Sequence, residues 1–246
     1  MNDVAKKIFS PIELSWVITY AIIAYYITTD IYTPSMPSIA KDFSVGEDMV
    51  QLSMVFFMGG SFLSTLISGA LAENFGRRRV FIGGQIMAVI SAIVCTLSPD
   101  IYTLIAARFF MGLGGAVTSV IGFSAVQDVY SPKESLKIFS IMGAAFAIVP
   151  AVAPILGGYL DLWFGWRSNF ISILVFLSGS LLVSTLAFRL PPKNDLLEPS
   201  GIFQILRKYR VILKNKKFLR YGIMNSVLIS GEWFYITILP FYFIQV

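Results

Sequence analysis

The chain has 246 residues, of which 56% are hydrophobic and 13% charged, with a net charge of +5 and a mean hydropathy of +0.75. A water-soluble domain carries about 25% charged residues, so the composition excludes that class and indicates a protein that lies in lipid. One cysteine, Cys95, and no histidine exclude a disulfide framework and a CxxC metal site, and they leave carboxylates as the proton carriers.

Apolar runs of about 20 residues, the length that crosses a bilayer as a helix, recur along the chain. They predict an all-α, polytopic membrane protein with transmembrane helices at 14–37, 49–72, 79–98, 101–126, 136–160, 168–188 and 218–244. The first helix is expected to be retained, because polar residues interrupt it and no small-residue cleavage site stands out. These helices divide into a six-helix bundle at 1–188, a cytoplasmic linker at 189–217, and the first helix of an incomplete second bundle at 218–246.

The linker contains a segment with helical periodicity. Apolar side chains fall on one face of it (Ile202, Ile205, Leu206, Tyr209, Ile212 and Leu213), and basic side chains fall on the other (Arg207, Lys208, Arg210 and Lys214). This pattern predicts an amphipathic helix that lies on the membrane surface.

Basic residues gather on one side of the predicted spans: Lys6, Lys7, Arg77, Arg78, Arg79, Lys133, Lys137, Arg189, Lys193 and the cluster at 207–220. The other side has Lys41 and Arg167 against Asp42, Glu47, Asp48, Asp100 and Asp161. The positive-inside rule therefore predicts a cytoplasmic N-terminus. The basic balance reflects this topology and contact with anionic lipid, and no nucleic-acid partner is expected.

Two segments of the chain resemble one another at a constant offset. Residues 69–78 and 158–167 share Gly, Leu, Phe, Gly and Arg at five equivalent positions, before the third and sixth helices. Three helices separate the copies, so they fall on opposite faces of the membrane. The pattern favours a 3+3 inverted-topology repeat over coincidence, although glycine and arginine are common at helix turns.

The first copy of this repeat also carries a recognisable loop motif. We expect Gly69 to let two helices approach closely and Gly76 to permit a tight turn. With Glu73, Arg77 and Arg78, these residues resemble the signature loop of the major facilitator superfamily.

The resemblance implies that Glu73, Arg77 and Asp128 form a charge cluster that holds one conformation of the transporter. Glu73 replaces the family's usual Asp, and Asn74 replaces a usual Arg, which implies a weaker relay. The alternative is that the arginines only anchor the loop at the lipid headgroups.

Arg108 lies about seven residues into the fourth span and precedes Gly112, Gly114 and Gly115, a run similar to the helix-four motif of the same superfamily. An arginine near the bilayer centre costs at least about 2.5 kcal/mol, so we expect Arg108 to face a wet cavity or a partner. The alternative is a side chain that snorkels to the outer interface, which Asp100 marks.

The fifth span carries Gly143, Pro150, Pro154, Gly157 and Gly158. Two prolines bend the helix, and the small residues permit close packing. The spacing resembles the antiporter motif of the superfamily, which implies export, whereas an ordinary kinked helix is the plain alternative.

The segments around Asp30, Trp166 and Pro240 resemble the Bcr/CflA branch of drug:proton antiporters. The resemblance covers essentially the whole chain, but the family has about twelve helices and this sequence ends inside the seventh.

Asp30 is the acidic residue of the first span. Burial in a half-apolar cavity penalises a charged carboxylate, which lets Asp30 bind a proton from outside and release it inside. Arg108 and, across the interface between bundles, Glu232 are expected to share this coupling. The alternative places Asp30 at the outer water interface, because Pro34 and Pro37 follow closely.

Together these features predict a non-enzymatic, proton-coupled exporter of small lipophilic or amphipathic molecules in the bacterial inner membrane, driven by the proton gradient without a cofactor. A nutrient symporter is a rival, against which the fifth helix argues. A second rival is a truncated, non-transporting half, because alternating access needs two bundles that move against each other.

Overall fold

The computed structural model describes residues 11–188 and 214–244. The side chains at the start of the first helix and along much of the last helix are not described. The chain divides into two compact units, Met1–Lys193 and Asn194–Val246. The first unit holds α2 (Pro11–Asp30), η1 (Thr33–Ser35), α3 (Met36–Asp42), α4 (Glu47–Phe75), α5 (Arg77–Thr96), α6 (Ile101–Val129), α7 (Pro132–Phe164) and α8 (Arg167–Ala187). The second holds α10 (Lys216–Ile244).

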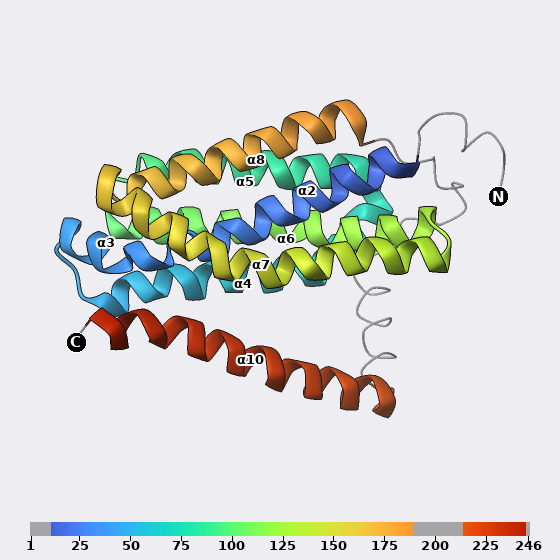
Figure 1. Cartoon of the computed structure of the whole chain (residues 1–246). Helices are drawn as coiled ribbons and strands as arrows, with labels where there is room; N and C mark the ends of the chain where they lie inside the picture. The colour runs from blue at the N-terminus through green and yellow to red at the C-terminus, as the bar shows by residue number, and fades with distance from the viewer. Residues whose placement is uncertain (1–10, 189–213, 245–246) are drawn as a thin grey trace. The chain divides into compact units, whose positions relative to one another are not determined.

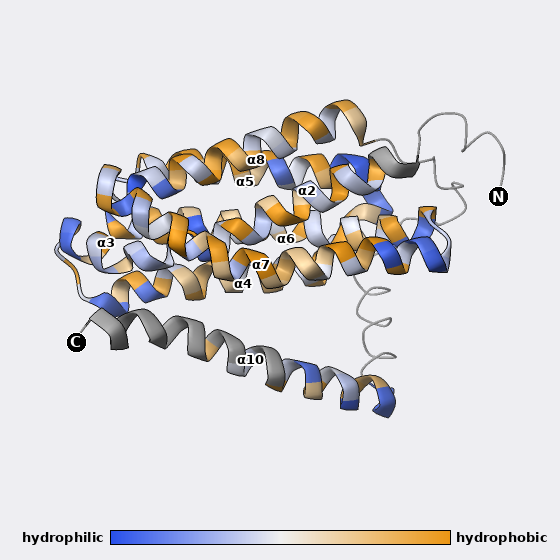
Figure 2. Ribbon diagram, viewed as in Figure 1, coloured by the Kyte–Doolittle hydropathy of each residue, from blue (hydrophilic) through white to orange (hydrophobic). Residues whose placement is uncertain are grey.

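The predicted all-α membrane fold is confirmed. Within the described residues, six helical segments of the first unit are long and apolar enough to span a bilayer. Their hydrophilic residues gather near the ends of the bundle, and apolar residues follow the lengths of the helices (Figure 2). The predicted interfacial helix lies, up to residue 213, outside the described residues.

The first unit is an antiparallel bundle in which successive helices run in opposite directions (Figure 1). We call the end where α2 begins the N-terminal end, and the end that holds α3 the α3 end. The antiparallel order brings the α4–α5 turn to the N-terminal end and the α7–α8 turn to the α3 end.

Glycines place α6 at the centre of the bundle, against α4, α5 and α2. A Cβ added at Gly112 would collide with the Phe57 carbonyl of α4, one at Gly114 would meet the backbone of α5, and one at Gly115 would collide with the ring of Tyr25. Close helix approach of this kind depends on small residues. The glycines therefore fix the three neighbours of Arg108, which lies one turn before Gly112 on the same helix.

The first span is broken, whereas the sequence predicts one continuous helix over 14–37. The helix α2 ends at Asp30, a short 3₁₀ turn follows, and α3 continues to Asp42. Pro34 and Pro37 lie in the first turns of η1 and α3, where a missing N–H breaks no helical hydrogen bond. The prolines therefore begin new helical segments, which carry the span beyond its predicted end.

Candidate functional site

The break in the first span surrounds a buried carboxylate. Asp30, the last residue of α2, is 3% exposed, so its side chain lies inside the protein. Its carbonyl accepts a hydrogen bond from the Thr33 hydroxyl at 2.8 Å, which fixes the turn after it. Tyr26, one turn earlier on α2, interacts electrostatically with the carboxylate. Asp30 is therefore shielded from solvent in this conformation, and its depth in the bilayer stays a prediction.

Arg108 is completely buried beside this break. Its Nη1 donates to the Thr28 carbonyl at 2.8 Å, and its guanidinium carbon lies 4.0 Å from the ring centre of Tyr32 and 4.2 Å from that of Phe57. Arg108 does not snorkel to the surface. Its partners are the end of α2 and two aromatic faces, and its partner Thr28 lies two residues before Asp30 in the chain.

The antiporter-like segment of α7 packs directly on the same break. A Cβ at Gly157 would collide with the Ile31 carbonyl, and one at Gly158 would touch Pro34 at 3.9 Å. Both prolines of the motif, Pro150 and Pro154, lie inside α7. Gly143, by contrast, has open space around it among the described residues, so close packing belongs to the end of the motif that contacts Ile31 and Pro34.

Asn169 of α8 joins η1 and α7 beside the break, and the sequence analysis predicts no role for this residue. Its Nδ2 donates to the Ser35 hydroxyl at 2.6 Å and to the Gly157 carbonyl at 3.2 Å. Asn169 is fully buried at the start of α8. Asn169 follows the turn glycine Gly165 by four residues, and only its partners on η1 and α7 show that it fixes the break.

The loop motif forms a charge cluster at the N-terminal end. Arg77 at the start of α5 makes an ion pair with Asp128 near the end of α6, and Glu73 interacts electrostatically with Arg77. The structure thus brings the three predicted residues together, while their action as a conformational latch stays a prediction. Gly76 has a positive φ of 87° and makes the expected turn.

Two expectations for this loop are wrong. Gly69 does not mediate a close helix contact, because an added Cβ would meet nothing within 4 Å among the described residues. Arg78 does not simply reach toward headgroups: its Nε donates to the Phe188 carbonyl at 2.7 Å and its Nη2 to the Thr185 carbonyl at 2.9 Å. Thr185 lies in the last turn of α8 and Phe188 directly follows that helix, so Arg78 caps its C-terminal end.

A second charge cluster lies at the α3 end. The Asp42 carboxylate accepts from the Trp166 indole at 3.0 Å and from Arg167 at 2.9 Å, and Ser38 donates to Asp161 at 2.6 Å. Gly165, which directly precedes Trp166, has a positive φ of 80°, like Gly76, the equivalent residue of the first repeat copy at the N-terminal end. Each copy of the repeated turn therefore places donors opposite an acid at the end of another helix.

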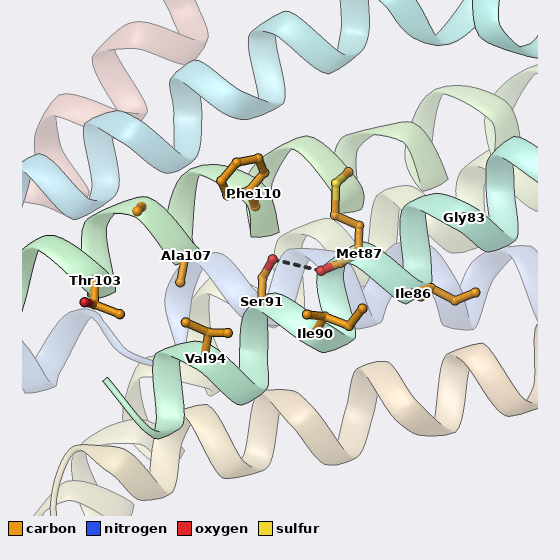
Figure 3. A pocket seen from close by; sticks show the side chains of 10 residues that line it. Gly83, Ile86, Met87, Ile90, Ser91, Val94, Thr103, Ala107 and Phe110 are labelled. Atoms are coloured by element: carbon orange, nitrogen blue, oxygen red, sulfur yellow. Dashed lines mark hydrogen bonds between the residues drawn. The ribbon is translucent and has the colours of Figure 1, made fainter. Parts of the chain in front are cut away.

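An apolar groove of about 550 Å³ runs between α5 and α6. Figure 3 shows Ile86, Ile90 and Val94 of α5 on one side of it and Phe110 of α6 on the other. The polar Ser91 hydroxyl in its floor donates to a carbonyl of its own helix at 2.8 Å. The groove contains no charged side chain, so it offers a surface for hydrocarbon and no site for proton chemistry.

Glu232, the third predicted coupling residue, lies in α10, and its side chain is outside the described residues. Its part in proton binding stays a prediction.

Comparison with known proteins agrees with these features. The family model described as Major Facilitator Superfamily matches residues 18–246. The chain belongs to the major facilitator superfamily. The loop motif, the buried arginine of α6 and the proline–glycine segment of α7 are thus features of a superfamily transporter bundle.

Bacterial transporters are among the relatives of this superfamily member. It is 33% identical over 216 residues to the uncharacterized MFS-type transporter YdgK of Bacillus subtilis, covering 86% of this chain and 53% of that protein. It is 30% identical over 211 residues to a bicyclomycin resistance protein homolog of Haemophilus influenzae, covering 85% and 52%. A chloramphenicol resistance protein of Pseudomonas aeruginosa is 29% identical over 175 residues, covering 70% and 41%.

Solved transporters share the fold. The human organic anion transporter MFSD10 aligns with a TM-score of 0.64 at 18% identity, over 80% of this chain and 53% of that one. A peptide transporter POT in complex with sulfate aligns with a TM-score of 0.63 at 16% identity, over 90% and 46%. The chain spans about half the length of the curated relatives it matches. It is a multi-pass membrane protein of a transporter family, and its bacterial relatives indicate the inner membrane.

Proposed function

We propose that this chain takes part in the proton-coupled export of small amphipathic molecules, with its N-terminus in the cytoplasm. The observation that carries the proposal is the buried Asp30 at the break in the first span, where Arg108 donates to the Thr28 carbonyl and Gly157 packs against the Ile31 carbonyl. An intramembrane carboxylate is costly, and in transporters such residues mark proton relays. Helix breaks at the bilayer midplane likewise mark binding sites in this class of proteins.

The direction of transport rests on α7. The antiporter-like segment Gly143–Gly158 contacts the break through Gly157 and Gly158, so a proton bound or released at Asp30 changes the charge one residue before the Ile31 contact with this helix. Relatives named for bicyclomycin, chloramphenicol and multidrug resistance support small amphipathic molecules as substrates. A nutrient symporter has no comparable support from the relatives or from α7.

The decisive test is uptake into everted vesicles, in which an exporter moves its substrate inward at the expense of a proton gradient. The chain is expressed alone and beside a polypeptide that supplies the second half of a relative such as the Haemophilus influenzae protein. Chloramphenicol uptake that collapses with the proton gradient and is lost in Asp30→Asn supports the proposal, and Glu232→Gln tests the second carboxylate in the same assay. Asp100→Asn is the matched control, because Asp100 is a half-buried acid outside the spans.

Uptake that Asp30→Asn leaves unchanged contradicts the assignment of the proton to Asp30. If neither arrangement transports at all while both insert in the membrane at wild-type levels, export itself is refuted. Activity of the chain alone would show that one bundle with α10 suffices.

A further inference from the structure

Arg108 occupies a gap whose walls fit a planar cation. Its guanidinium lies between the ring faces of Tyr32 and Phe57, which belong to the turn after α2 and to α4. Aromatic faces attract cations, and the attraction is stronger where water is excluded. The Tyr32 hydroxyl contacts Ser53 at 3.3 Å and the Met54 sulfur at 3.6 Å, so its ring is held in place independently of Arg108.

The floor of this gap is electronegative as well. Thr28 lies in the last turn of α2, and its carbonyl accepts from Arg108 at 2.8 Å. The C-terminal end of a helix carries a partial negative charge, and the ends of broken helices coordinate cations in other transporters. Asp30, two residues further along, adds a carboxylate to the same neighbourhood.

Arg108 has fewer oxygen acceptors than two arginines nearer the ends of the bundle. A guanidinium has five N–H donors, but among the described residues the Thr28 carbonyl is the one oxygen to which Arg108 donates, and its other hydrogen bonds go to thioether sulfurs at 3.5 and 3.8 Å. Its Nε has no hydrogen-bond partner among the described residues. Arg78 and Arg167 each donate to two oxygens. To leave the gap, Arg108 gives up one strong hydrogen bond together with its contacts to the two rings, and a planar cation that enters the gap would restore them.

We propose that the gap between Tyr32 and Phe57 is a binding site for a planar, delocalised cation, and that Arg108 is its built-in occupant in this conformation. When Arg108 withdraws, the site takes the amidinium, guanidinium or similar planar cationic group of a transported molecule. The second statement rests on the proposed export function, whereas the first concerns the site alone.

The site is tested without transport, by removing its occupant. Arg108→Ala empties the gap, and methylguanidinium added to the purified full chain in detergent should fill it. We expect methylguanidinium to raise the melting temperature of this variant saturably, by about 3 °C near saturation. The melting temperature of the wild-type chain should be the same in methylguanidinium chloride as in sodium chloride at the same concentration. Adding Tyr32→Leu to Arg108→Ala should abolish the shift, because one ring face is lost.

Two controls separate a specific site from a general effect of the salt. Arg77→Ala removes a guanidinium from the exposed pair with Asp128 and should show no rescue. Arg108→Met fills the gap with a thioether side chain and should show none either. If Arg108→Ala does not fold, recovery of monodisperse protein extracted with methylguanidinium, and not with sodium chloride, supports the site equally.

Absence of any methylguanidinium-dependent shift or recovery in Arg108→Ala overturns the proposal, as does an equal shift in Arg77→Ala. These outcomes leave the export function untouched, because neither measures transport. If the chain binds methylguanidinium but does not transport, the proposed site stands and only its role in binding a transported molecule is refuted.

Discussion

Arg78 and Arg167 cap each other's helices from opposite ends of the bundle. Arg78 at the start of α5 donates to the Thr185 and Phe188 carbonyls at the end of α8, and Arg167 at the start of α8 donates to the Ser98 carbonyl just after α5, at 3.2 Å. The two arginines hold equivalent positions in the repeated turns. A two-fold axis in the membrane plane would exchange them, which is the relation that an inverted repeat requires.

This reciprocal capping predicts similar losses from Arg78→Gln and Arg167→Gln. Each variant leaves helix-terminal carbonyls without a charged donor, which costs about 1 kcal/mol and lowers the melting temperature by about 2–4 °C. Thermal unfolding of the purified chain by circular dichroism measures both. Arg79→Gln, in the same exposed arginine run, is the control and should change little; an equal loss there would contradict the capping role.

The contrast between two glycines of α7 gives a second prediction. Gly157→Ala forces a Cβ into the Ile31 carbonyl and should push α7 away from the break, with a loss of folded protein or of transport. Gly143→Ala meets open space and should stabilise the helix by about 0.5–1 kcal/mol. Both substitutions add one methyl group to the same motif. Equal behaviour of the two, in thermal unfolding and in vesicle uptake, would show that contact with the break is unimportant.

A buried polar bridge between α5 and α8 gives a third prediction. The Gln85 amide donates to the Ser184 hydroxyl at 3.0 Å and accepts from the Ser180 hydroxyl at 3.2 Å. Gln85→Leu leaves both hydroxyls without this partner and should destabilise the bundle by about 1–3 kcal/mol. The Ser184→Ala/Gln85→Leu double variant should lose less stability than the sum of the losses in the two single variants. Strict additivity in thermal unfolding would argue against the bridge.

Asp100, outside the spans, makes stability depend on acid. It caps α6, and hydrogen bonds from the Thr103 backbone and hydroxyl hold the pKa of its carboxyl below the usual value. A pKa lowered by folding means that this contribution is present above about pH 3.9 and is lost as the pH falls through the folded-state pKa. The melting temperature of Asp100→Ala should therefore lie below wild type at neutral pH and converge with it in acid. Asp100→Asn, which retains a capping oxygen, should remain closer to wild type throughout.

Much of this structure follows from local sequence. The apolar runs predict six of the helices because lipid demands about 20 apolar residues at each crossing, and Gly76 predicts its turn because only glycine adopts that φ readily. The break at Asp30 escaped prediction because prolines both end and begin helices, and the choice depends on what packs against them.

Other features depend on tertiary neighbours that no spacing encodes. The motif around Gly69 matches the family, yet the open space beside it exists only in three dimensions. Phe188, Thr28 and Ser35, which accept from Arg78, Arg108 and Asn169, lie 110, 80 and 134 positions away in the chain. The sequence therefore marks the arginines as important without showing what they contact.

Cys95, the lone cysteine, is 0% exposed near the end of α5. The native thiol is thus shielded from aqueous maleimides while the protein is folded. A cysteine introduced at an exposed position would then be the only thiol that such a reagent modifies. Placed at Lys133 or at Asp100, which lie at opposite ends of the bundle, such probes would be modified by impermeant reagents from opposite sides of intact cells. The chain is already suited to mapping its own sidedness, and a reagent that reached the Lys133 position from outside would reverse the orientation deduced from its basic loops.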